Sequence, residues 1–139
     1  MPTNRPTMNE LLEAVREFLE AKVMPAIDRT TTFYVRVAVN VLGIVEREIE
    51  KGPGLDAAEH ERLRKLLKQD GTLKDLNAAL CQKVREGRVD CKDPTLIEHL
   101  RLTVMGRLSI DNPHYAAYER ALTAEQGEGK STAISGIVR

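Results

Sequence analysis

The stretch that decides the fold class is Phe33-Tyr34-Val35-Arg36-Val37-Ala38-Val39-Asn40-Val41. From Tyr34 to Val41, valines alternate with other residues, and this pattern is typical of a strand. The apolar positions also fit helical spacing, and the stretch continues into Glu46-Arg47-Glu48 without a turn. No second strand candidate exists in the sequence, and a lone strand has no partner for its backbone groups. We therefore interpret the stretch as part of a helix, with a strand as the alternative.

Capping and breaking signals on either side predict further helices. Thr7 and Glu10 form a capping box that starts a first helix, and Pro25 should end or kink that helix. The predicted fold is all-α, a compact antiparallel bundle of about five helices with a C-terminal tail. Residues 1–113 form the helical bundle domain, and residues 114–139 form a short helix (Tyr115 to Leu122) and a tail that starts at Gly127. The other helices are expected from a cap in Thr30–Thr32 to Gly52-Pro53-Gly54, from Asp56 to Asp70-Gly71, from a cap at Thr72 to Gly87, and from Asp93-Pro94 to Asp111-Asn112-Pro113.

Size and charge exclude several classes of protein. The chain has 139 residues and 15.6 kDa, and its 21 basic residues balance 21 acidic ones. A neutral chain lacks the surplus of basic charge that nucleic-acid binding needs. The most apolar run, Val37 to Val45, is far shorter than the ~20 residues of a membrane helix. We expect a cytoplasmic protein without a nucleic-acid or membrane partner, because the N-terminus also lacks an apolar signal core.

Two sets of polar residues stand out on the predicted helices. Arg36, Asn40 and Arg47 share with Gly43 a strip of the otherwise apolar central helix, which indicates either a solvated edge or a two-arginine groove for an anion or a partner's carboxylate. Glu48 and Arg107 fall inside apolar arcs, near the expected ends of their helices. We predict that Glu48 pairs with Arg107, with Asp111 as a local competitor, in a structural polar network.

The spacing of the histidines and cysteines along the sequence does not indicate a catalytic or metal site. His60, His99 and His114 lack a second ligand at helical spacing, and local spacing ties no histidine or other base to Cys81 or Cys91. Residues 124–131 match a relaxed phosphate loop, but neither a buried strand before it nor a long helix after it is expected. We therefore expect no catalytic residues, no metal and no cofactor.

Three stretches share their order of residues with a known family. They are Leu11-Leu12-x-x-Val15-x-x-Phe18-Leu19, then Phe33-x-x-Arg36-Val37-Ala38-x-Asn40-x-Leu42-x-Ile44-Val45-x-Arg47-Glu48, and Leu100-Arg101-x-Thr103-Val104-x-x-Arg107-Leu108 with Asp111-Asn112-Pro113-x-Tyr115. Over roughly residues 7–115 the chain resembles a small bacterial all-helical family of unknown function. That family is associated with aminoglycoside-phosphotransferase-like kinases and acyl-CoA dehydrogenases, so the resemblance implies an accessory role near such enzymes. The family has no established catalytic residues that could be transferred.

The sequence thus predicts a non-enzymatic accessory or protein-interaction module with a protein partner or a homodimer. The alternative is a small-molecule binding protein, or a non-catalytic enzyme subunit, for an anionic or acyl ligand. Arg36, Asn40, Arg47 and Arg107 are the candidate binding residues.

Overall fold

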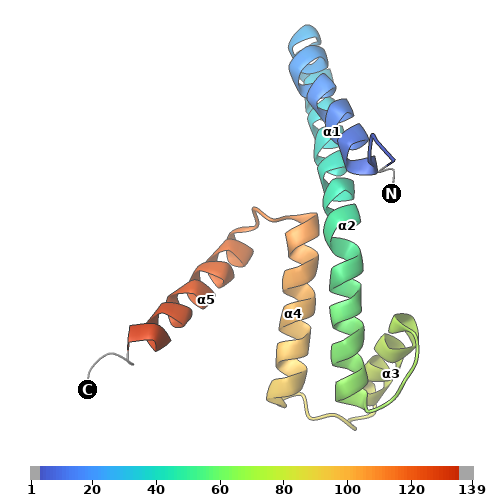
Figure 1. Cartoon of the computed structure of the whole chain (residues 1–139), viewed down its shortest axis with the longest axis vertical. Coiled ribbons are helices and arrows are strands. Elements are labelled where there is room, and N and C mark those ends of the chain that lie inside the picture. Colours follow the sequence, from blue (N-terminus) through green and yellow to red (C-terminus); the bar gives the residue numbers. More distant parts are fainter. Residues whose placement is uncertain (1–3, 135–139) are drawn as a thin grey trace.

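The computed structural model describes residues 4–134, with side chains for residues 4–127. All regular elements in this range are helical, so the all-α prediction is confirmed and the strand alternative is excluded for the described chain (Figure 1). The elements are α1 (Met8–Phe18), a π-helical segment (Leu19–Val23), a 3₁₀ turn (Met24–Ala26), α2 (Arg29–Leu67), α3 (Leu73–Arg85), α4 (Pro94–Asp111) and α5 (Ala116–Ile134).

Most predicted helix starts are confirmed. Thr7 and Glu10 form the capping box of α1, Thr72 caps α3, and Asp93 caps α4 with Pro94 in its first turn. The cap of α2 differs from the prediction, because Asp28 and not the threonine cluster is the N-cap. Asp28 Oδ1 accepts a hydrogen bond from the backbone N–H of Thr31 at 3.0 Å.

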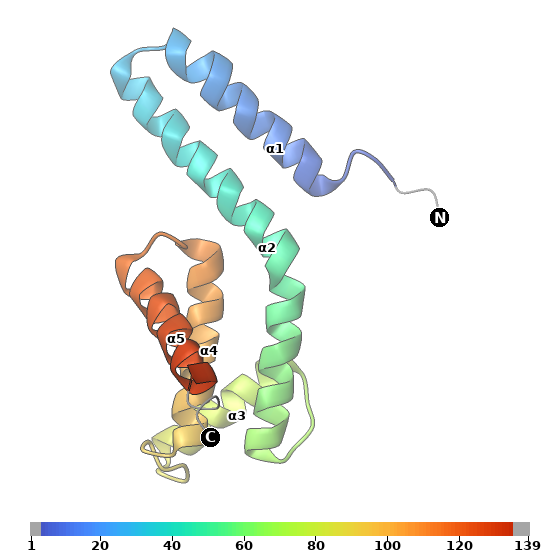
Figure 2. The ribbon, with the colours of Figure 1, turned by 60° about the vertical axis from the view of Figure 1, so that its left-hand side comes forward.

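The predicted break at Gly52-Pro53-Gly54 is wrong. α2 continues through Pro53 to Leu67, so the two helices expected on either side of that break are one helix of 39 residues. Figure 2 shows that α2 bends near its middle. Proline costs about 3 kcal/mol inside a helix, and packing against other elements can offset such a cost. Contacts from α4 to both sides of Pro53, described below, supply that packing.

The predicted C-terminal tail is also partly wrong. α5 runs to Ile134 and includes Gly127, where the tail was expected to start. The last part of that tail, residues 135–139, lies outside the described residues.

The helices form a packed body and a projecting hairpin (Figures 1 and 2). The hairpin consists of α1 and the first half of α2, and the body consists of the second half of α2 with α3 and α4. The core lies in the body where α2, α3 and α4 meet. α5 diverges from α4 (Figure 1) and is joined to it by an ion pair between Arg101 and Glu125. The core residues are Leu63, Leu67, Leu76, Leu80 and Leu96.

Among the described residues, no helix is both long enough and apolar enough to cross a membrane.

Candidate functional site

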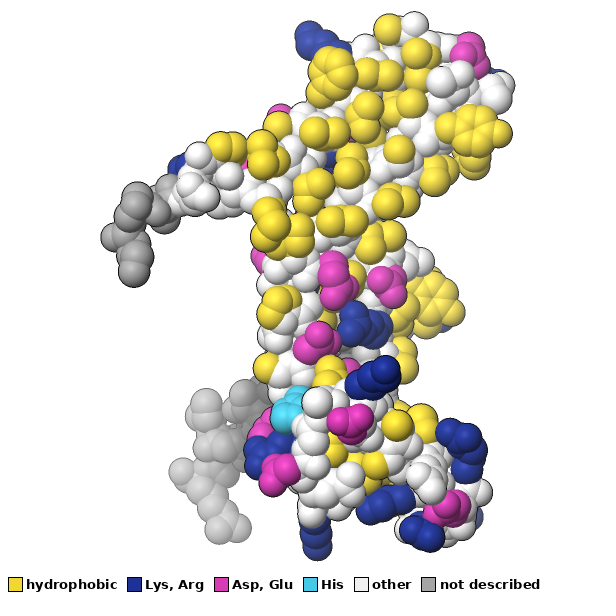
Figure 3. Space-filling model, turned by 90° about the vertical axis from the view of Figure 1, so that its right-hand side faces the viewer, with side chains coloured by type: hydrophobic (Ala, Val, Ile, Leu, Met, Phe, Trp, Pro, Cys, Tyr) yellow, Lys and Arg dark blue, Asp and Glu magenta, His cyan; other side chains and the backbone are white. Residues whose placement is uncertain are grey.

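The hairpin leaves a row of large apolar side chains in solvent. α1 has no buried residue, and the first half of α2 buries only Val39 and Gly43. Figure 3 shows hydrophobic side chains gathered over the hairpin and charged ones below them. We call this surface the hairpin face; its residues, all between 41% and 65% exposed, are Met8, Leu11, Val15, Phe18, Phe33, Val37, Val41 and Val45.

A groove lies where the hairpin meets the loop between α4 and α5. Its volume is about 340 Å³, which is within the range of small-molecule sites. Two half-buried arginines, Arg16 and Arg47, lie in it, whereas the acidic residues Glu20 and Asp111 are exposed. The remaining lining residues are Val39, Asn40, Gly43, Ile44, Asn112, Pro113 and His114.

Gly43 allows the two arginines of the groove to approach each other. A Cβ atom on Gly43 would lie 3.2 Å from Arg47 Nη1 and 3.7 Å from Arg16 Nη1, so the guanidinium of Arg47 occupies the space of a side chain at this position. Arg47 Nε donates a hydrogen bond to the carbonyl oxygen of Ile110 at 2.6 Å. This bond links α2 to the last turn of α4, where the helix dipole favours a cation.

Arg16 belongs to a small polar cluster between α1 and α2. Its Nη1 lies 3.4 Å from Glu46 Oε2, and both side chains are largely covered. Arg16 Nε and Glu46 Oε1 are buried without a hydrogen-bond partner among the described residues. Buried polar groups in this state are rare, and each one calls for a specific explanation.

The structure brings together only some of the predicted site residues. Asn40 and Arg47 line the groove, and Asp111 joins them from the end of α4. Arg36 is exposed one turn before Asn40 and does not line the groove. Arg107 lies on the body, so it is separate from the strip with which it was grouped.

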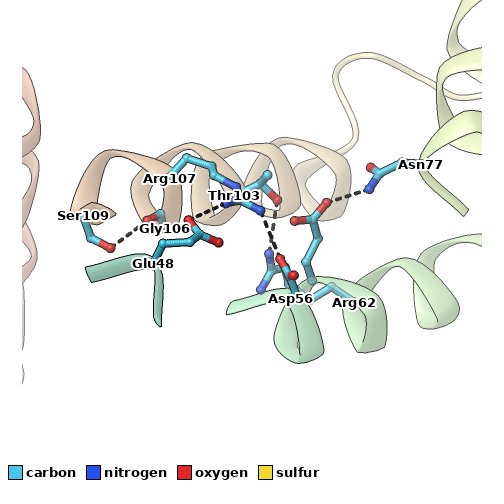
Figure 4. A network of polar contacts seen from close by, with 9 residues as sticks. Glu48, Asp56, Arg62, Asn77, Thr103, Gly106, Arg107 and Ser109 are labelled. Atoms are coloured by element: carbon cyan, nitrogen blue, oxygen red, sulfur yellow. Dashed lines mark hydrogen bonds and ion pairs between the residues drawn. The ribbon is translucent and has the colours of Figure 1, made fainter. Parts of the chain in front are cut away.

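Arg107 bridges two carboxylates on α2 (Figure 4). Its Nη1 lies 3.4 Å from Glu48 Oε2, as predicted, and its Nη2 lies 3.0 Å from Asp56 Oδ1. The second carboxylate is therefore Asp56 and not Asp111. Glu48 precedes Pro53 and Asp56 follows it, so Arg107 joins the two sides of the bend in α2. All three side chains are nearly half exposed, so the network is a set of surface ion pairs between α2 and α4.

Among the residues whose side chains are described, His99 is the one buried ionisable residue, and it does not line the groove. Arg62 Nε donates to His99 Nδ1 at 3.4 Å, and Arg62 Nη2 donates to Thr103 Oγ1 at 3.2 Å. Burial lowers the pKa of His99, and the charge of Arg62 lowers it further. His99 is therefore neutral at neutral pH and supports the packing of α4 on α2.

Sequence reasoning missed Arg16. A usable signal was present, because Arg16 shares the three-to-four spacing of Leu12, Leu19 and Val23 and is thus a charge on an apolar face. Arg16 and Arg47 lie on different helices of the hairpin, and the spacing within one helix does not report a contact between two helices.

Within the described part of the chain, no three His, Cys, Asp or Glu side chains are placed to hold a metal ion. Comparisons with curated proteins and with solved structures found no match. A family model does match residues 25–115, which contain α2, α3 and α4 and make up well over half of the chain. The chain therefore belongs to the family described as a domain of unknown function, DUF6285.

Proposed function

We propose that this protein is a non-enzymatic interaction module that self-associates through its hairpin face and acts as an accessory to a partner enzyme. The observation that carries this proposal is the hairpin face itself. Eight large apolar side chains are exposed on α1, which has no buried residue, and on the first half of α2, which buries only Val39 and Gly43. A concentration of exposed apolar side chains of this kind is typical of a site of protein–protein contact.

The size of the hairpin face suits a dimer. Half-exposed side chains of this size each leave roughly 100 Å² in solvent. Together the eight leave on the order of 800 Å², which is about what each partner buries in a standard stable interface.

The composition of the hairpin face suits a second copy as its occupant. None of its eight residues is charged. A two-fold contact sets the same patch against itself, so a charge near the axis would repel its own copy. Two hairpins packed in this way form a four-helix bundle, in which the exposed face of each hairpin becomes the core.

The first experiment is light scattering on the purified chain during size-exclusion chromatography. We expect twice the 15.6 kDa of one chain. Val41→Glu places a charge on the hairpin face and should give a monomer, whereas Val84→Glu, at an exposed valine on α3, should leave the dimer intact. A wild-type monomer at micromolar concentration, or a Val41→Glu dimer of unchanged affinity, contradicts self-association.

The accessory role rests on the resemblance to proteins that occur with phosphotransferase-like kinases and acyl-CoA dehydrogenases. Co-expression of the chain with a kinase or dehydrogenase encoded next to it should yield a complex that survives chromatography. If the chain is a monomer but the complex forms and Val41→Glu disrupts it, the hairpin face binds the enzyme and not a second copy. Clean separation of the pair, with the enzyme's activity unchanged, refutes the accessory role.

A further inference from the structure

We propose that the groove between the hairpin and the α4–α5 loop binds a small carboxylate, held by Arg47 with Asn40 and Arg16. This site is separate from the hairpin face and does not depend on self-association. None of the groove's lining residues belongs to the hairpin face.

Arg47 has a guanidinium that is only partly used. Nε is bound to the carbonyl oxygen of Ile110. Among the residues whose side chains are described, no carboxylate oxygen lies within 4.0 Å of Arg47. A half-buried arginine normally has an anionic partner, because burial makes an uncompensated charge costly. The Nη donors of Arg47 are therefore available to a ligand in the groove.

Gly43 lets the two guanidinium groups of the groove converge. Because the Arg16 and Arg47 Nη1 atoms both lie within 4 Å of the position of a Cβ on Gly43, two guanidinium groups converge beside bare backbone. Arg16 is held there by Glu46, and its Nε remains buried without an acceptor. Asn40, one turn before Gly43, adds an amide that can donate to the same ligand.

The charges of the groove select the class of ligand. A planar guanidinium matches a planar carboxylate through two parallel hydrogen bonds. The exposed Glu20 and Asp111 side chains also line the groove, and they repel a ligand of high negative charge. A ligand with one or two carboxylates therefore fits, whereas pyrophosphate and nucleoside phosphates are disfavoured.

The proposal can be tested by NMR titration of the ¹⁵N-labelled full chain with sodium succinate at constant ionic strength. Saturable shifts are expected at the amides of Gly43 and Arg47 and at the side-chain Nε of Arg16. Sodium pyrophosphate should give much weaker shifts. Arg47→Gln should weaken succinate binding by about ten- to a hundredfold, the range for loss of a hydrogen bond to a charged group.

Two control variants keep the test interpretable. Arg36→Gln removes a charge from the same helix outside the groove and should leave the dissociation constant within about twofold, the range of a distant surface charge. Asn40→Asp changes an exposed side chain with little risk to folding, and it should abolish binding by placing a carboxylate in the groove. Asn4→Asp adds the same charge elsewhere and should have no effect.

Several results would overturn the proposal. They are the absence of shifts at Gly43 and Arg47, an equal loss of binding in Arg36→Gln and Arg47→Gln, and unchanged binding in Asn40→Asp. Stronger shifts with pyrophosphate than with succinate would show that the carboxylate assignment is wrong.

Discussion

Pro53 offers the sharpest test of the fold, because it lies inside a continuous helix where the sequence favours a break. A proline in a helix interior removes one hydrogen bond and introduces a steric clash, at a cost of about 3 kcal/mol relative to alanine. The bend in α2 relieves part of the clash, whereas the lost hydrogen bond remains. Pro53→Ala should therefore raise the free energy of unfolding by about 1–3 kcal/mol, or the melting temperature by about 4–12 °C.

Urea titration followed by circular dichroism at the helix band measures this gain. Pro94→Ala is the matched control, because Pro94 lies in the first turn of α4, where proline is favourable. That change should lower the free energy of unfolding by about 0.5–1 kcal/mol. If Pro53→Ala leaves stability unchanged or lowers it, with the same dependence on urea, then residues 52–54 form a connection and not a helix.

Three further predictions concern the contacts between α2 and α4. Burial lowers the pKa of His99 below the value of about 6.5 that it has in the unfolded chain, so the unfolded chain binds a proton more readily than the folded one. The free energy of unfolding should therefore fall as the pH drops through about 6.5. His99→Gln should flatten this part of the pH profile in urea titrations. Arg107→Gln removes two ion pairs between nearly half-exposed side chains and should lower the free energy of unfolding by about 1 kcal/mol or less, with a smaller loss in high salt. A loss that is several times larger and insensitive to salt would contradict this description. Gly106→Val should cost about 2 kcal/mol in the same assay, because even a Cβ on Gly106 would lie 3.0 Å from Leu55 Cδ2, and an unchanged midpoint would refute the close packing of these helices.

Local signals predicted the helices well where capping alone decides them. The boxes and caps at Thr7, Thr72 and Asp93 need only neighbouring residues, and all three are present. Gly52-Pro53-Gly54 carries an equally strong local signal, yet the helix continues. The reason lies far along the chain, because α4 packs on α2 on both sides of the proline, with Ile110 bound by Arg47 before it and Gly106 against Leu55 after it.

The predicted number of helices is right for mixed reasons. Two helices expected around Gly52-Pro53-Gly54 are one, and the segment expected to be a short helix and tail is a helix of 19 residues. The second error has a different source from the first. Gly127 and Gly129 lower helix propensity, but a glycine without neighbours within 4 Å, such as Gly127, does not by itself end a helix.

The candidate site was predictable only in part. Asn40 and Arg47 share one side of α2 with Gly43, and helical spacing was sufficient to group them. Arg36 shares that side but lies beyond the reach of the α4–α5 loop. The roles of Arg16 and Asp111 depend on how α1 and α4 are placed against α2, and these placements are set by tertiary packing.

A change in the bend angle of α2 would move the hairpin tip farther than it moves the groove. About 23 residues separate the tip of the hairpin from the bend, which corresponds to about 35 Å of helix. A change of about 10° in the bend would therefore carry the tip about 6 Å, a distance that follows from that length. The groove's α2 residues, Val39 to Arg47, lie about 9 to 21 Å from the bend and would move by about 2 to 4 Å. A partner bound near the tip would thus change the width of the groove by a smaller distance than the tip itself moves.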